Sequence, residues 1–87
     1  MEPTPNTMAT MRAKLEVRGA EKTGTTLKLN MAAVCGTDPF GPNGESEDNT
    51  YSMWTPTATL EMYITNPALT DKFKVGQKFY VDFTEAQ

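Results

Sequence analysis

The chain has 87 residues with a formal net charge of −3, and 38% of its residues are hydrophobic. This length suits a single domain, because division into two would leave pieces too small to bury a core. The acidic balance argues against polyanion binding driven by net charge, although a local basic face remains compatible with it.

The first part of the chain predicts an extended arm followed by a β-hairpin. Residues 1–10 hold prolines and threonines without apolar periodicity, so we expect an N-terminal arm there and one β-domain over residues 11–87. Apolar residues alternate with charged ones over residues 11–18, which is the period of a half-buried strand. Residues 19–24 predict a turn, and the alternation resumes over residues 27–33.

Residues 35–49 predict a long loop, because three glycines and two prolines interrupt any regular element. The loop contains Asp38, Glu45, Glu47 and Asp48 and no basic residue. These are oxygen donors, but the spacing of an EF-hand is missing and the flanking segments read as strands. We therefore expect a solvated acidic loop without a metal ion.

Three further strands are predicted in the second half of the chain. Residues 51–54 form a short one that Pro56 ends, and the alternation over residues 59–65 and 78–84 predicts the other two. The five strands are too few to cover both faces of an open sheet. We therefore expect an all-β fold, either a small five-stranded antiparallel barrel or a compact sandwich.

One short helix is predicted before the last strand. Asn66 followed by Pro67 is a typical helix start, with a side-chain cap and then a residue whose fixed φ suits the first turn. Leu69 and Phe73 are four positions apart, so such a helix could lay both side chains on the sheet, and Gly76 would end it.

The chemistry that is missing argues against an enzyme. The chain has no histidine, and its single cysteine, Cys35, has no histidine to activate it. A zinc site would need more Cys or His ligands, and no phosphate-binding glycine motif occurs. No signal peptide or membrane-length apolar run is found either. We expect a protein without cofactor or metal that is made in a cytoplasm, stays soluble, and works by binding.

The candidate binding residues combine a basic strand face with aromatic side chains in the polar phase of other strands. Such a combination on a small barrel is typical of single-stranded nucleic-acid binding, through phosphate contacts and base stacking. The plain alternative is a solvated strand face on which tyrosine rings cover the sheet. Asp82 should pair with a base such as Lys14 or Lys28, or bind a partner. The candidates are Arg12, Lys14, Arg18, Lys28, Trp54, Tyr63, Tyr80 and Asp82.

Residues 54–85 read WTPTATLEMYITNPALTDKFKVGQKFYVDFTE. With the strand at residues 11–17 and the acidic middle, this resembles a group of short uncharacterised proteins of tailed bacteriophages that end in a G-x-x-F/Y-Y-V-D-F-T strand. The resemblance implies a phage origin and transfers no catalytic or binding residue. The matching residues are Trp54, Thr55, Pro56, Ile64, Asn66, Pro67, Gly76, Phe79, Tyr80, Val81, Asp82, Phe83 and Thr84.

Three binding functions stay open. The first is a virion accessory that decorates or cements a phage capsid or tail, through arms and β-edges that bridge neighbours. The second is a host-defence antagonist that binds an immune effector or sequesters a nucleotide signal, with Arg12, Lys14 and Tyr80 lining pockets at subunit junctions of a homo-oligomer. The third is single-stranded nucleic-acid binding. The expected partners are thus a phage structural protein or a host factor, in the virion or the host cytoplasm and away from membranes.

Overall fold

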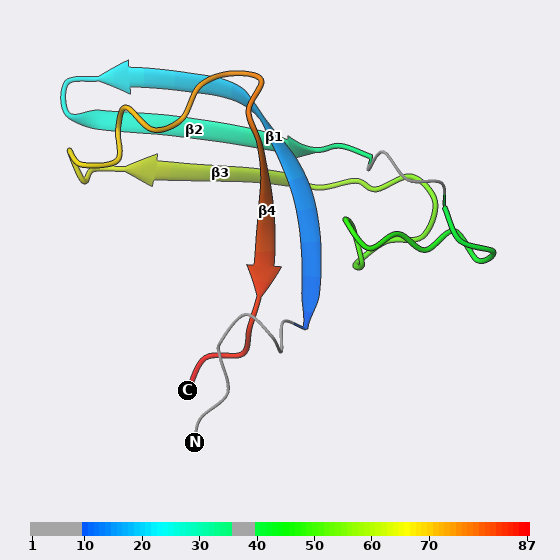
Figure 1. The fold of residues 1–87 in the computed structure, drawn as a ribbon. Coiled ribbons are helices and arrows are strands. Elements are labelled where there is room, and N and C mark those ends of the chain that lie inside the picture. Colours follow the sequence, from blue (N-terminus) through cyan, green and yellow to red (C-terminus); the bar gives the residue numbers. More distant parts are fainter. Residues whose placement is uncertain (1–9, 36–39) are drawn as a thin grey trace.

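The computed structural model describes residues 10–35 and 40–87, and these residues form strands, turns and bends without a helix. Residues 1–9 of the predicted arm lie outside the described residues. The strands are β1 (Met11–Thr23), β2 (Thr26–Ala33), β3 (Thr59–Ile64) and β4 (Lys78–Phe83). They form one antiparallel sheet in the order β3-β2-β1-β4 (Figure 1). The predicted all-β class is confirmed, and the described chain offers no apolar helix of membrane-spanning length.

The long strand β1 bends and pairs with two other strands. Residues 11–16 pair with β4, whereas residues 15–23 pair with β2. The register shifts between Val17 and Gly19, so Arg18 is the additional residue of a β-bulge, which bends a strand. The N-terminal half of β1 and its partner β4 therefore turn away from the direction of β2 and β3 (Figure 1).

The hairpin turn is shorter than the sequence predicts. Residues 19–23 continue β1, and Thr23 pairs with Thr26 around the two residues Gly24 and Thr25. Gly24 has φ 62°, the left-handed value that the first central position of a type II′ turn requires. Gly19 is a strand residue next to the bulge, not the start of the turn.

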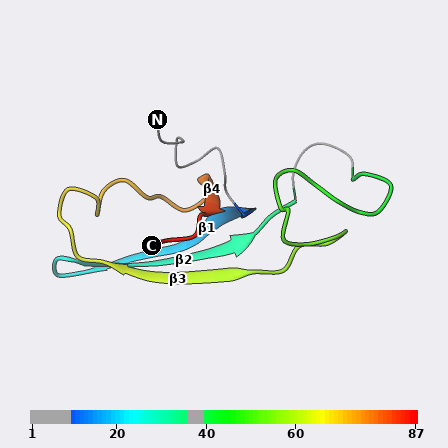
Figure 2. The ribbon, with the colours of Figure 1, turned by 90° about the horizontal axis from the view of Figure 1, so that it is seen from below.

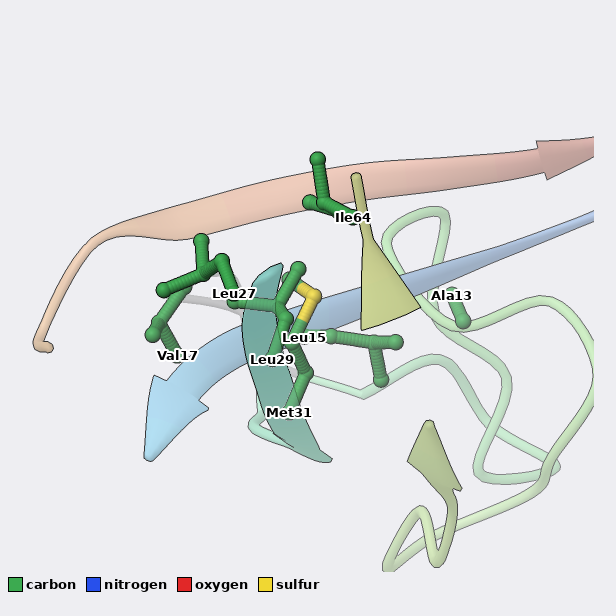
Figure 3. Close-up of a cluster of buried hydrophobic side chains, with 7 residues drawn as sticks. All are labelled: Ala13, Leu15, Val17, Leu27, Leu29, Met31 and Ile64. Atoms are coloured by element: carbon green, nitrogen blue, oxygen red, sulfur yellow. The ribbon is translucent and has the colours of Figure 1, made fainter. Parts of the chain in front are cut away.

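The core lies on one face of the sheet. The apolar residues of β1 and β2 that alternate with charged ones point to this face, where their side chains gather with that of Ile64 from β3 (Figure 3). The loops over residues 40–58 and 65–77 lie on the same side of β2 and β3 (Figure 2). They add Tyr51, Ala58 and Phe73 to the packing. The buried core residues are Ala13, Leu15, Val17, Leu27, Leu29, Met31 and Ile64.

The predicted third strand is not a strand, so the described residues contain four strands where five are predicted. Residues 51–54 are turn and bend, and Ser52 N–H donates to Asn49 C=O at 3.1 Å in a local turn. Trp54 has φ 61°, a left-handed backbone that an extended strand cannot contain. The sheet consequently keeps β3 and β4 as edges, and the described residues form one open sheet where a closed barrel or a compact sandwich is predicted.

The segment after Asn66 forms successive turns where a helix is predicted. Asn66 Oδ1 accepts from Ala68 N–H at 3.0 Å, as a helix cap would. The backbone bonds that follow join Leu69 to Asn66 and Lys72 to Leu69, each three residues apart. A single turn forms too few hydrogen bonds to offset the conformational entropy that helix nucleation costs. Phe73 packs on Phe79 with ring centroids 5.3 Å apart, whereas Leu69 remains 42% exposed.

Candidate functional site

Four of the predicted residues meet on the polar face of the sheet, where β1 pairs with β4. Arg12 is the cross-strand partner of Asp82, and Lys14 is the cross-strand partner of Tyr80. Asp48, from the acidic loop, is the fifth member of this polar cluster. Residues in the same phase of adjacent antiparallel strands lie on one face, which is why the alternation brings these four together.

The polar cluster is held by ion pairs, a hydrogen bond and ring stacking. Arg12 Nε and Nη2 donate to the two carboxylate oxygens of Asp82 at 2.7 and 3.1 Å. The guanidinium carbon lies 4.4 Å from the centroid of the Tyr80 ring. Tyr80 Oη donates to Asp48 Oδ1 at 3.0 Å, and Lys14 Nζ lies 3.5 Å from Asp48 Oδ2. Asp82 thus pairs with Arg12, not with Lys14 or Lys28.

Charge pairing shifts two pKa values in this cluster. The hydrogen bonds from Arg12 lower the pKa of the Asp82 carboxyl, and the attraction of the opposite charge adds to this effect. The same bonds raise the pKa of the Arg12 guanidinium. Both groups are therefore charged near neutral pH and neutralise each other, so the cluster does not present a free positive charge at Arg12.

A buried asparagine fixes the acidic loop against β1, and the sequence gives no separate signal for it. Asn49 is 2% exposed, accepts from Lys14 N–H at 2.8 Å and donates to Val34 C=O at 2.9 Å. Next to it, Thr50 N–H donates to Arg12 C=O and Thr50 Oγ1 accepts from Arg12 N–H. Residues 49–50 thereby provide hydrogen-bond partners for the backbone groups of β1 that lie beyond the end of β2. They also place Asp48 next to Lys14.

Three other predicted residues lie elsewhere and have acidic neighbours. Arg18, at the bulge, lies 3.0 Å from Glu16. Lys28 and Tyr63 are cross-strand partners of β2 and β3, and both approach Glu61, at 4.0 and 3.0 Å. The basic face predicted from the sequence is therefore a set of ion pairs spread along the sheet.

Trp54 is exposed on the loop and stands apart from the polar cluster. The residue is 56% exposed, and its ring lies beside that of Phe40, with ring centroids 5.8 Å apart. The Trp54 ring covers Gly44, where an added Cβ would meet ring atoms at 2.5 Å. Trp54 N–H also donates to Gly44 C=O at 2.6 Å. The ring is therefore seated on a backbone that only glycine allows.

An apolar groove of about 110 Å³ is lined by residues of β1, β4 and the start of β3, together with Tyr51 and Ala58 from the loop. Phe83, at its rim, is 46% exposed. Tyr51 Oη is buried nearby without a hydrogen-bond partner among the described residues, and burial raises the pKa of this phenol. The groove is lined by Met11, Ala13, Leu15, Tyr51, Ala58, Thr59, Leu60, Val81 and Phe83.

No trio of His, Cys, Asp or Glu side chains within residues 10–35 and 40–87 is placed to hold a metal ion. The comparisons with known proteins add no relative. No protein-family model matches the chain, and no curated protein and no solved structure is significantly similar to it. The resemblance to short tailed-phage proteins therefore stays a prediction from the sequence.

Proposed function

We propose that this chain is a non-catalytic module that binds a protein partner, and that it serves as an accessory of a phage virion, decorating or cementing the capsid or tail. The phage origin rests on the resemblance of residues 54–85. The binding role rests on the exposed pair Phe40 and Trp54, which we call the aromatic pair.

The aromatic pair is the observation that carries the proposal. Trp54 is 56% exposed, although a bulky apolar ring gains free energy by burial. Its φ of 61° costs on the order of 1–2 kcal/mol for a residue with a Cβ. A strained backbone that presents an exposed tryptophan is typical of an interaction site, because tryptophan is enriched among residues that dominate protein interfaces.

The two other candidate functions receive less support from the polar cluster. Nucleic acid or a nucleotide would need free cations for its phosphates. Arg12 is bonded to Asp82, and Lys14 lies against Asp48. A phosphate would have to displace these carboxylates. The ion pairs elsewhere on the same face raise the same obstacle.

The virion role is tested on purified particles of a phage that encodes the chain. Density-gradient particles are analysed by quantitative mass spectrometry, together with the unassembled protein fraction of the lysate. The expected result is the chain at a fixed ratio to a capsid or tail protein. Its absence from particles, with abundant protein in the lysate, would show that the accessory role is wrong.

The binding site is tested with Trp54→Ala in the same phage. We expect particles that lack the chain, while the purified variant keeps the wild-type far-ultraviolet circular dichroism spectrum. Tyr63→Ala is the matched control, because Tyr63 is also an exposed aromatic residue, at 61% exposure, but lies on β3. If Trp54→Ala particles carry the chain at wild-type occupancy, Trp54 is not the contact.

A further inference from the structure

The outer edge of β4 has backbone groups that no described residue occupies. On the inner side, the N–H groups of Arg12 and Lys14 bond to the 49–50 segment and not to β4. In an antiparallel pair, two residues that stand opposite each other either exchange both backbone bonds or both face away. The cross-strand partners Asp82 and Tyr80 therefore turn their N–H and C=O groups to the outer edge. This is an unpaired edge of the kind that templates another strand.

We propose that two copies of this chain pair antiparallel through their β4 edges, with Tyr80 of one copy opposite Tyr80 of the other. In this register, Lys78 of each copy faces Asp82 of the other copy on the polar face. On the apolar face, Phe79 of each copy faces Val81 of the other. The edge is thus complementary to itself in both charge and hydrophobicity, as a two-fold interface requires.

The pairing continues charge rows that already exist within each copy. Lys78 Nζ lies 3.8 Å from Glu16, and Arg12 binds Asp82 at 2.7 Å. The new contact joins the Lys78 end of one row to the Asp82 end of the other. Each resulting row crosses four strands with alternating sign, in the order Glu16, Lys78, Asp82, Arg12.

Other pairings of an edge with the same edge of a second copy lack this complementarity. A shift by two residues places Tyr80 opposite Lys78 or Asp82 and removes both ion pairs, and a shift by one opposes the apolar and polar faces. The other edge strand, β3, has Glu61 as its only charged residue. Pairing of β3 with its own copy would therefore create no pair of opposite charges, and in the register centred on Glu61 it would place two carboxylates opposite each other.

The dimer also suits the size of the chain, because a small domain buries a limited share of its surface and gains from association. The pairing goes beyond the proposed function and does not depend on it, since the aromatic pair lies on the loop and not on β4. Failure of the virion test would leave the β4 pairing untouched, and the reverse also holds.

The test uses charge exchange and sedimentation equilibrium on the full chain. Wild type is expected to be a dimer in low salt. Lys78→Glu and Asp82→Lys should each weaken self-association about tenfold or more, because each variant opposes like charges at both pairs. An equimolar mixture of the two variants restores opposite charges at both pairs, so it should form a heterodimer that associates more tightly than either variant alone. Recovery in the mixture also shows that both variants fold.

Glu61→Lys is the matched control, since it makes the same size of charge change on the β3 edge, and it should leave dimerisation as in wild type. A wild-type chain that stays monomeric up to its solubility limit would overturn the proposal. Self-association of the single variants at wild-type strength would also overturn it. The same conclusion would follow from a mixture that associates no more tightly than either variant alone.

Discussion

Arg12 and Asp82 lie opposite each other on β1 and β4, and the guanidinium donates to both carboxylate oxygens, at 2.7 and 3.1 Å. The bond joins the first strand of the chain to the last, seventy residues apart. Such two-point geometry fixes the relative position of the strands more tightly than a single contact would. It also explains why the charged side chains at this end of the polar face pair with one another.

Asp82→Asn is expected to reduce thermal stability near neutral pH by a small amount, because both partners reach solvent and exposed pairs contribute little. Arg12 lowers the pKa of Asp82 in the folded state. The stabilisation is therefore fully present above the unfolded pKa of about 4 and is lost as the pH falls through the lower folded value. Melting curves of wild type and variant should converge in acid.

The control for this prediction is Asp71→Asn. Asp71 makes one contact with Lys22 at 3.4 Å and is 84% exposed, so its loss should change the melting temperature less than the loss of Asp82. A difference between wild type and Asp82→Asn that persists unchanged at low pH would contradict the role of the ionised carboxylate.

Asn49→Ala should lower the free energy of unfolding by about 2–3 kcal/mol, because it leaves the partly buried N–H of Lys14 and C=O of Val34 without partners. Urea denaturation measures the change. Asn43→Ala, at an exposed position of the same loop, should change it by less than about 0.5 kcal/mol. Equal effects of the two substitutions would mean that Asn49 does not fix the loop.

The strand pattern could be predicted from the sequence because one face of the sheet is buried and the other is solvated. Leu15 and Val17 alternate with Lys14 and Glu16 for this reason, and the same phase placed Arg12 beside Asp82. The bulge at Arg18 could not be predicted, because a glycine such as Gly19 is typical of a turn and because a strand of thirteen residues is unusual.

The loop contacts could not be predicted from the sequence either, for a different reason. Asn49 resembles any polar loop residue until β2 ends and leaves the edge of β1 without a partner. Residues 51–54 show the alternation of a strand over four positions, which is too short to separate a strand from a turn. Trp54 was a candidate from the sequence, but its seat on Gly44 depends on the left-handed backbone of both residues.

Tyr51→Phe should raise the free energy of unfolding by about 1 kcal/mol, because the buried hydroxyl has no partner among the described residues. Burial raises the pKa of Tyr51, and nearby Cys35 adds to the shift. The stabilisation that comes from keeping the phenol neutral is present below about pH 10 and is lost as the pH rises through the folded value.

Alkaline denaturation is the second measurement for this position. Wild type should lose stability above about pH 10 more steeply than Tyr51→Phe. Tyr63→Phe is the control, since Tyr63 is exposed and its hydroxyl donates to Glu61 at 3.0 Å. A destabilised Tyr51→Phe would show that its hydroxyl has a hydrogen-bond partner in solution.

Gly44→Ala should displace the ring of Trp54 and lower the free energy of unfolding by more than about 1–2 kcal/mol, the cost of a left-handed backbone alone. Gly44 has φ 82°, and an added Cβ would also collide with the ring at 2.5 Å. Trp54 is the only tryptophan in the chain, so its fluorescence reports the displacement directly.

Gly24→Ala is the control, because Gly24 has φ 62° but no atom within 4 Å of the added Cβ. It should lose stability from backbone strain alone and keep the wild-type emission and acrylamide quenching. Since the aromatic pair depends on this seat, Gly44→Ala should also weaken partner binding as Trp54→Ala does, whereas unchanged fluorescence in Gly44→Ala would show that the ring does not rest on Gly44.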